Sequence, residues 1–108
     1  MTIDVINVTR YYCCMIKSFR DNDSEKAFRG EPVRRMPSDI RRVTQRKLVI
    51  LHAAEALQDL RVPPGNRLER LKGDRAGQHS IRINDQWRVC FRWEKGNATD
   101  VEVVDYHD

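Results

Sequence analysis

The sequence predicts an α+β domain in which an antiparallel sheet of about four strands carries two helices on one face. Two patterns predict this class. Apolar and polar residues alternate over 79–93 and again over 101–104, as expected of half-buried strands. Apolar residues recur at helical spacing over about 39–59, which indicates an amphipathic helix. A chain of 108 residues suits one such domain with a modest core.

The first part of the chain predicts one short strand and one short helix. Apolar and polar residues alternate over 15–19, which favours a strand. Residues 23–28 are expected to form a helix with an Asp or Ser as its N-cap. Residues 1–14 show no core pattern. We expect them to be an N-terminal extension, consistent with an upstream start codon, before a single domain over 15–108.

The longest helix is expected over about 39–59, with Ser38 as its N-cap. Its apolar positions lie on one stripe and are Ile40, Val43, Ile50, Leu51, Ala54 and Leu57. Arg41, Arg42 and Arg46 lie away from this stripe. The helix is therefore expected to pack its apolar side on the sheet and to show its basic side to water or to a partner. A turn at 63–66, rich in proline and glycine, ends the helical region.

The register of the hairpin that follows can be tested by parity. A three-residue turn at 84–86 pairs Ile81 with Val89 and Arg82 with Arg88, and it keeps the apolar side chains on one face. A two-residue turn would mix the two faces. The other face carries arginines, so we expect it to be open and basic. Opposed arginines destabilise a hairpin, so either an anion binds there or both side chains turn into the solvent.

Positive charge gathers in two blocks. Residues 29–47 hold seven bases and two acids, and residues 61–92 hold eight bases and three acids. Residues 93–108 hold one base and five acids, so the chain ends on an acidic segment. A basic field of this kind favours a polyanionic partner, with RNA or DNA first, although a solvated helix face would give the first block equally well.

The cysteines and the hydropathy of the chain indicate the cellular compartment in which the protein is expected. The three cysteines, Cys13, Cys14 and Cys90, are odd in number and have no zinc-type spacing, so neither a disulfide framework nor a metal site is expected. The N-terminus lacks the pattern of a signal peptide, and no apolar run is long enough to span a membrane. We expect a cytoplasmic protein that does not enter a membrane.

Several segments together resemble a known family. They are MIKSF at 15–19, PPGNRL at 63–68, LKGDRAGQHSIRINDQWR at 71–88 and VDYH at 104–107. Over about 15–107 the chain resembles the HigB toxins, which belong to the RelE/ParE superfamily of type II toxin–antitoxin systems. The long central motif followed by a terminal DYH is highly specific.

The resemblance implies a ribosome-dependent endonuclease that cleaves mRNA in the ribosomal A site and needs no metal or other cofactor. It implies a HigA-type antitoxin with a helix-turn-helix domain, through which the complex would bind operator DNA. One position departs from the pattern. Some HigB toxins have a histidine implicated in catalysis two residues before the Leu of LKG, and Glu69 stands there in this chain.

Cleavage of this type needs a base for the 2′-hydroxyl, cations on the phosphate and an acid for the leaving oxygen. His107 is the first acid–base candidate, because an imidazole has an ordinary pKa of about 6.5. Arg88 is assigned to the scissile phosphate, which a guanidinium can bind through two bonds. The other catalytic candidates are Lys72, Tyr106, Asp105 and Glu69, and the RNA-binding candidates are Arg75, Arg82, Arg67 and Arg70.

Each of these assignments has a plainer alternative. A penultimate histidine usually lies in a frayed end, Asp105 suits the turn after a strand, and Glu69 can simply pair with Arg67 or Arg70. Two other functions also remain open. A ParE-like toxin acts on DNA gyrase and is not a nuclease, and a simple RNA-binding module would need only the basic face.

Overall fold

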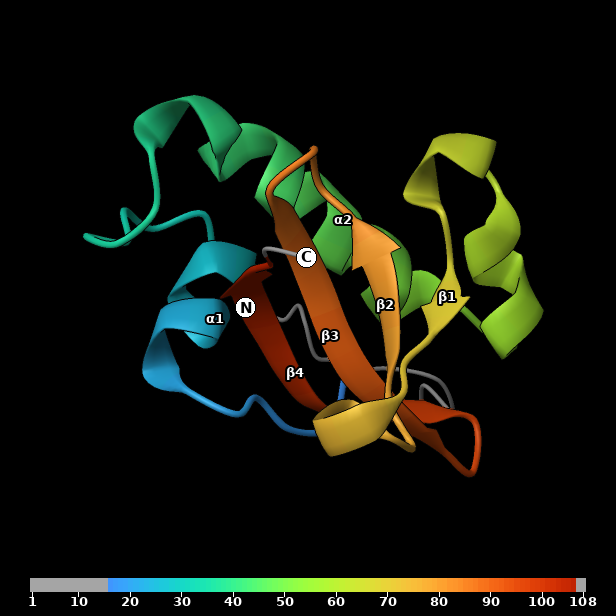
Figure 1. Cartoon of the computed structure of the whole chain (residues 1–108). Helices are drawn as coiled ribbons and strands as arrows, with labels where there is room; N and C mark the ends of the chain where they lie inside the picture. Colours follow the sequence, from blue (N-terminus) through green and yellow to red (C-terminus); the bar gives the residue numbers. More distant parts are fainter. Residues whose placement is uncertain (1–15, 107–108) are drawn as a thin grey trace.

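The computed structural model describes residues 16–106 (Figure 1). It has two α-helices, α1 (Asn22–Phe28) and α2 (Arg41–Ala53). The strands are β1 (Glu69–Arg70), β2 (His79–Arg82), β3 (Trp87–Glu94) and β4 (Asn97–Asp105). Four short 3-10 helices lie between these elements: η1 (Ser38–Ile40), η2 (Leu57–Arg61), η3 (Pro64–Asn66) and η4 (Gly73–Arg75). The predicted extension, 1–14, lies outside the described residues and stays a prediction.

The four strands form one antiparallel sheet in the order β1-β2-β3-β4. Its central hairpin has the predicted register, with Ile81 opposite Val89 and Arg82 opposite Arg88. The backbone N–H of Ile83 donates to the carbonyl of Trp87 across a three-residue turn. Parity therefore identified the correct pairing, because only this register buries all the apolar side chains on one face.

Both helices pack on the same face of the sheet, as predicted. Figure 1 shows α2 passing behind the strands and α1 lying beside β4. Leu48 and Leu51 of α2 are fully buried against this face. The strands supply the fully buried side chains Ile81, Val89, Phe91, Val101 and Val103. Burial of each such side chain contributes about 1.5–3 kcal/mol, so this layer carries most of the stability.

Helix α2 ends at Ala53, so the predicted end near 59 is wrong. The carboxylate of Asp59 accepts hydrogen bonds of 3.0 Å from the backbone N–H groups of Glu55 and Ala56. These bonds cap the separate turn η2, and they replace the bonds that would have continued α2. The predicted cap at Ser38 is also wrong, because Ser38 begins η1 and no side chain caps this end.

The predicted strand over 15–19 is replaced by two isolated bridges, Ile16 with Ala98 and Phe19 with Val101, both parallel to β4. The backbone N–H of Ile16 donates to Nδ1 of His52 in α2 at 3.2 Å. This segment therefore joins the helical layer to the last strand.

Helix α1 forms where predicted, but its cap is Asp21, whose carboxylate accepts from the N–H of Ser24 at 2.8 Å. No described helix is long and apolar enough to cross a membrane.

Candidate functional site

The sheet face opposite the helices brings Arg88 of β3 against groups from the other three strands. Its Nη1 donates to Oγ of Ser80 in β2 at 2.9 Å and lies 3.4 Å from Oε1 of Glu69 in β1. Its Cζ lies 5.7 Å from the ring centroid of Tyr106, directly after β4. We call these four residues, Glu69, Ser80, Arg88 and Tyr106, the Arg88 cluster.

Arg88 is held in place but is reachable from solvent. Its side chain is 16% exposed, whereas that of Glu69 is 52% exposed. Ser80 is fully buried, and its hydroxyl holds the guanidinium in place through this hydrogen bond. The Tyr106 ring adds a cation–π contact, and its backbone N–H donates to the carbonyl of Gln86 at 2.6 Å. The cluster therefore presents an ordered cation whose carboxylate partner, Glu69, lies on the solvent side.

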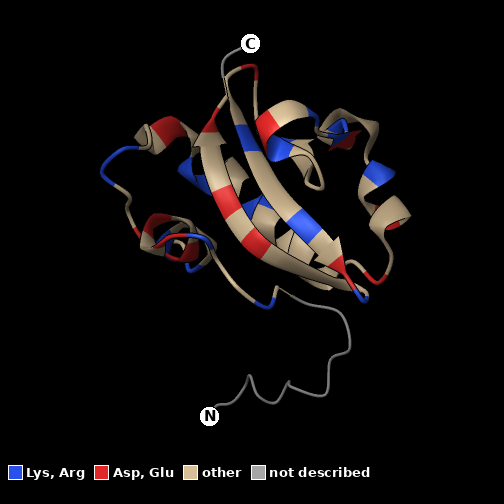
Figure 2. Ribbon diagram, turned by 60° about the horizontal axis from the view of Figure 1, so that its bottom comes forward, with Lys and Arg blue, Asp and Glu red and all other residues tan. Residues whose placement is uncertain are grey.

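The prediction that both opposed arginines turn into the solvent is wrong, whereas binding of an anion at this place stays a prediction. Arg82 pairs with Asp85 in the turn, and Arg88 pairs with Glu69 of β1. Each guanidinium therefore has its own carboxylate, which relieves the repulsion between the two cations. Figure 2 shows this mixture of charges as basic and acidic positions next to each other on the strands.

Lys72 lies on the loop that directly follows β1. The backbone N–H of Leu71 donates to the carbonyl of Gln78 at 2.9 Å, which closes this loop at its base. Lys72 is exposed, and its ammonium makes no ion pair or hydrogen bond within the described residues. It is therefore a cation that can meet an anion two residues beyond the end of β1.

Arg75, predicted to bind RNA, points inward. Its Nη1 lies 3.3 Å from Oε1 of Glu102 in β4 and donates to Oε1 of Gln78 at 3.1 Å. Arg20 lies 3.8 Å from the same Glu102 oxygen. Turn η4 thus lies over the lower end of the sheet in Figure 1 and is fastened to it by an ion pair. The expectation of an open, basic face is wrong for this half of the sheet.

The same loop covers Cys90 of β3, which lies near Arg75. Cys90 stands opposite Glu102 and is fully buried. Burial raises the pKa of its thiol to about 11; Glu102 adds to this shift, and Arg75 and Arg88 oppose it. A protonated, enclosed thiol of this kind is unreactive. We assign Cys90 no chemical role.

Of the remaining predicted RNA-binding residues, Arg82 stands opposite Arg88, whereas Arg67 and Arg70 are not part of the Arg88 cluster. Arg67 is exposed and has a left-handed backbone just before β1. Arg70 stands opposite His79, so the pleat places it on the face away from Glu69. Burial, and then the charge of Arg70, lowers the pKa of His79. Arg82 is half-buried at the end of the sheet with Asp85.

The end of β4 places Asp105 opposite Trp87, and its carboxylate accepts from Nε2 of Gln86 at 3.1 Å. His107 lies outside the described residues, so its role as acid or base stays a prediction. Within 16–106, no group of three or more His, Cys, Asp or Glu side chains is placed to hold a metal ion.

Two residues that position the site were not predicted. Ser80 holds Arg88, and Glu102 holds Arg75. Glu102 stands between the buried Val101 and Val103, and Ser80 is two residues before Arg82, so the parity that selected Arg88 also marks both as facing the same side. Applying that parity to all polar strand positions would have found both.

The chain is similar to proteins of one known family. A family model described as "RelE-like toxin of type II toxin-antitoxin system HigB" matches residues 17–107. The chain is similar to "Toxin HigB-1" of Vibrio cholerae, 45% identical over 85 residues that cover 78% of this chain and 90% of the relative. It is 33% identical to "Endoribonuclease HigB" of Proteus vulgaris over 94 residues, 86% of this chain and all of the relative. The chain therefore belongs to the RelE-like HigB toxins of type II toxin–antitoxin systems.

Proposed function

We propose that this toxin is an endoribonuclease that cleaves mRNA in the ribosomal A site without a metal ion and so inhibits translation. The observation that carries the proposal is the Arg88 cluster, in which an ordered guanidinium lies beside a solvent-side carboxylate. The name of the Proteus vulgaris relative supports the reaction type.

The chemistry follows from these groups. A phosphate that reaches Arg88 replaces Glu69 as its anionic partner, because a guanidinium binds two phosphate oxygens at once. The freed Glu69 carboxylate then lies close enough to take the proton of the attacking 2′-hydroxyl. Electrons of that oxygen form a bond to phosphorus, and the bond to the 5′-oxygen breaks. The products are a 2′,3′-cyclic phosphate and a 5′-hydroxyl, whose proton comes from His107.

The other groups bind and orient the substrate. Lys72 adds charge stabilisation to the phosphorus centre as negative charge develops there. The ring of Tyr106 stacks on a base of the mRNA, which requires an unpaired, splayed-out nucleotide. Asp105 orients His107.

The partners follow from the type of toxin. A type II toxin has an antitoxin, and we propose a HigA-type protein whose helix-turn-helix domain gives the complex its contact with operator DNA. The ribosome and its mRNA are the proposed targets, and the site of action is the cytoplasm.

The experiment is to express the toxin in growing cells and to map the 5′ ends of the mRNA. The proposal predicts cuts that keep phase with the reading frame, and none in cells that make the Arg88→Ala variant. A DNA-damage response with no cut mRNA would overturn the proposal in favour of ParE-like action on gyrase. Growth arrest with neither result would also overturn it.

A further inference from the structure

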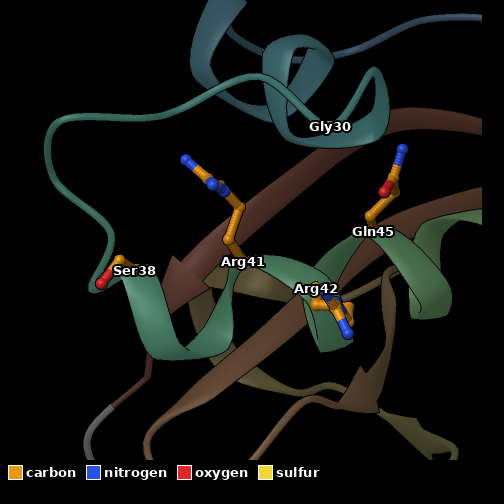
Figure 3. Close-up of a pocket in the computed structure, with 5 residues that line it drawn as sticks. All are labelled: Gly30, Ser38, Arg41, Arg42 and Gln45. Atoms are coloured by element: carbon orange, nitrogen blue, oxygen red, sulfur yellow. The ribbon is translucent and has the colours of Figure 1, made fainter.

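A polar pocket of about 260 Å³ lies on the helical side of the molecule, at the start of α2. It is lined by Gly30, Ser38, Arg41, Arg42 and Gln45. In Figure 3, Arg41 extends from α2 into the space enclosed by the loop that joins Gly30 to Ser38. None of the Arg88 cluster lines this pocket, so it is separate from the site described above.

The pocket is already shaped without a ligand. Nε2 of Gln45 donates to the carbonyl of Phe28 at 3.2 Å, which holds the end of α1, just before the loop, against α2. Gly30 has a φ of +79°, and a Cβ there would meet Nε2 of Gln45 at 2.8 Å. Only glycine therefore allows this close contact. A ligand would not have to order this wall of the pocket.

The far end of the loop is fixed by Arg35. Its Nε lies 2.9 Å from Oδ2 of Asp23, and its Nη2 donates to the carbonyl of Val103 at 2.9 Å. Its Cζ also lies 5.9 Å from the ring centroid of Trp87. The loop is thus tied to α1 and to β4 as well as to α2.

The two arginines of the pocket have no ion-pair partner among residues 16–106, whereas Arg29 and Arg35 beside it do. Arg29 pairs with Glu25 and Glu31, and Arg35 pairs with Asp21 and Asp23. Within the described residues, the guanidinium groups of Arg41 and Arg42 make neither an ion pair nor a hydrogen bond. The acids of α1 and of the loop therefore have other partners, and Asp39 of η1 is a further acid beside the pocket.

We propose that this pocket binds a backbone phosphate of structured RNA and so docks the toxin on ribosomal RNA. The inference rests on the proposed function for the choice of RNA. The lining has two free guanidiniums, a hydroxyl and an amide, and no large apolar side chain. Nucleic-acid interfaces are polar and positive in this way, whereas the centres of protein interfaces are rich in aromatic and apolar groups.

A further arginine of α2 extends the positive charge beyond the pocket. Arg46 is exposed and stands one helical turn after Arg42, a rise of about 6 Å along α2. That separation is comparable with the distance between neighbouring phosphates of one strand. Arg46 is therefore placed to meet the phosphate next to the one in the pocket.

The test measures binding of the full chain to a short mixed-sequence RNA duplex between about 50 and 200 mM salt. The variant Arg41→Gln/Arg42→Gln should bind at least about tenfold more weakly, because charged hydrogen bonds are lost. The slope of log affinity against log salt should fall by about one for each phosphate contact removed. The matched control is Arg61→Gln/Lys95→Gln, which removes two exposed charges of η2 and the β3–β4 turn.

The outcomes separate this inference from the proposed function, because duplex binding reports on the pocket and mRNA cleavage by the wild-type chain reports on the reaction. A loss confined to the pocket variant supports the inference. Equal losses in both variants would show a general charge effect and overturn it. A pocket variant that binds RNA normally but loses its antitoxin would also overturn it, in favour of a protein carboxylate as the occupant.

Discussion

Nη1 of Arg88 lies 3.4 Å from Oε1 of Glu69, although a whole strand, β2, separates the strands that carry them. Arg88 reaches across Ser80 to make this contact, and Ser80 Oγ accepts from the same nitrogen. The pair places a proton acceptor beside a phosphate-binding cation. It also gives one of the two opposed arginines a carboxylate of its own, which reduces the repulsion between them.

The first prediction concerns Glu69. Glu69→Gln keeps an oxygen for Arg88 but removes the carboxylate that takes the proton, so single-turnover mRNA cleavage should slow about 10²-fold or more. Glu69→His supplies a base at the same position and should recover much of the rate. If the Gln variant cleaves as fast as the wild type, Glu69 only pairs with Arg88.

Ser80 is predicted to act by positioning Arg88. Ser80→Ala removes the buried acceptor of Arg88 Nη1, and cleavage should slow about tenfold, which corresponds to one charged hydrogen bond. In an Arg88→Ala background the same change should have no further effect, because the two residues act together. Additive losses in this double-mutant cycle would contradict the assignment.

Glu102 is predicted to fasten the loop that carries Lys72. Glu102→Gln breaks the Arg75 ion pair, so η4 should lift and expose Cys90. In a chain with Cys13→Ser and Cys14→Ser, a thiol reagent should then modify Cys90 faster. Both the exposure and the loss of a nearby negative charge act in this direction. The matched control is Asp100→Asn, which breaks only the Arg92 pair on the surface. Equal rates in the two variants would exclude the fastening role.

The stability of the fold should depend on His52 below neutral pH. Burial lowers the pKa of His52, so the unfolded chain binds a proton that the folded chain does not. Stability should therefore fall as the pH drops below about 6.5 and continue to fall toward the lowered pKa. Protonation also removes the Nδ1 acceptor of the Ile16 N–H.

Urea unfolding at about pH 7.5 and about pH 5.5 measures this effect. His52→Asn keeps an acceptor near the Nδ1 position but does not titrate, so its midpoint should change less with pH than that of the wild type. His79→Asn is the control for the other histidine whose pKa is lowered, and it should leave the His52 contribution intact. An unchanged pH dependence in His52→Asn would assign the effect elsewhere.

The sheet could be predicted because the alternation in the sequence and the pairing of the strands both depend on which side chains are apolar. The alternation of Ile81, Trp87 and Val89 with the arginines allows only one register that buries every apolar side chain, and that register is observed. The identity of Arg88 as the central cation came from the same parity.

Side-chain contacts between distant segments could not be predicted in this way. The end of α2 depends on which backbone groups Asp59 captures, and periodicity carries no information about that choice. The partner of Arg88 depends on β1, whose two residues are too few to show any alternation. Arg75 was expected to meet RNA because the sequence does not show that Glu102 lies beneath it.

Single-turnover cleavage of mRNA, compared on programmed ribosomes and in free solution, tests the central proposal most directly. The wild-type toxin should cut the ribosome-bound mRNA and leave the free mRNA intact. Arg88→Ala should cut about 10²–10³-fold more slowly, because the cation on the developing phosphorane charge is lost, while the folded domain and the antitoxin complex persist. His107→Ala should slow cleavage and flatten its pH dependence near neutrality. Cleavage by Arg88→Ala at the wild-type rate would contradict the proposed site.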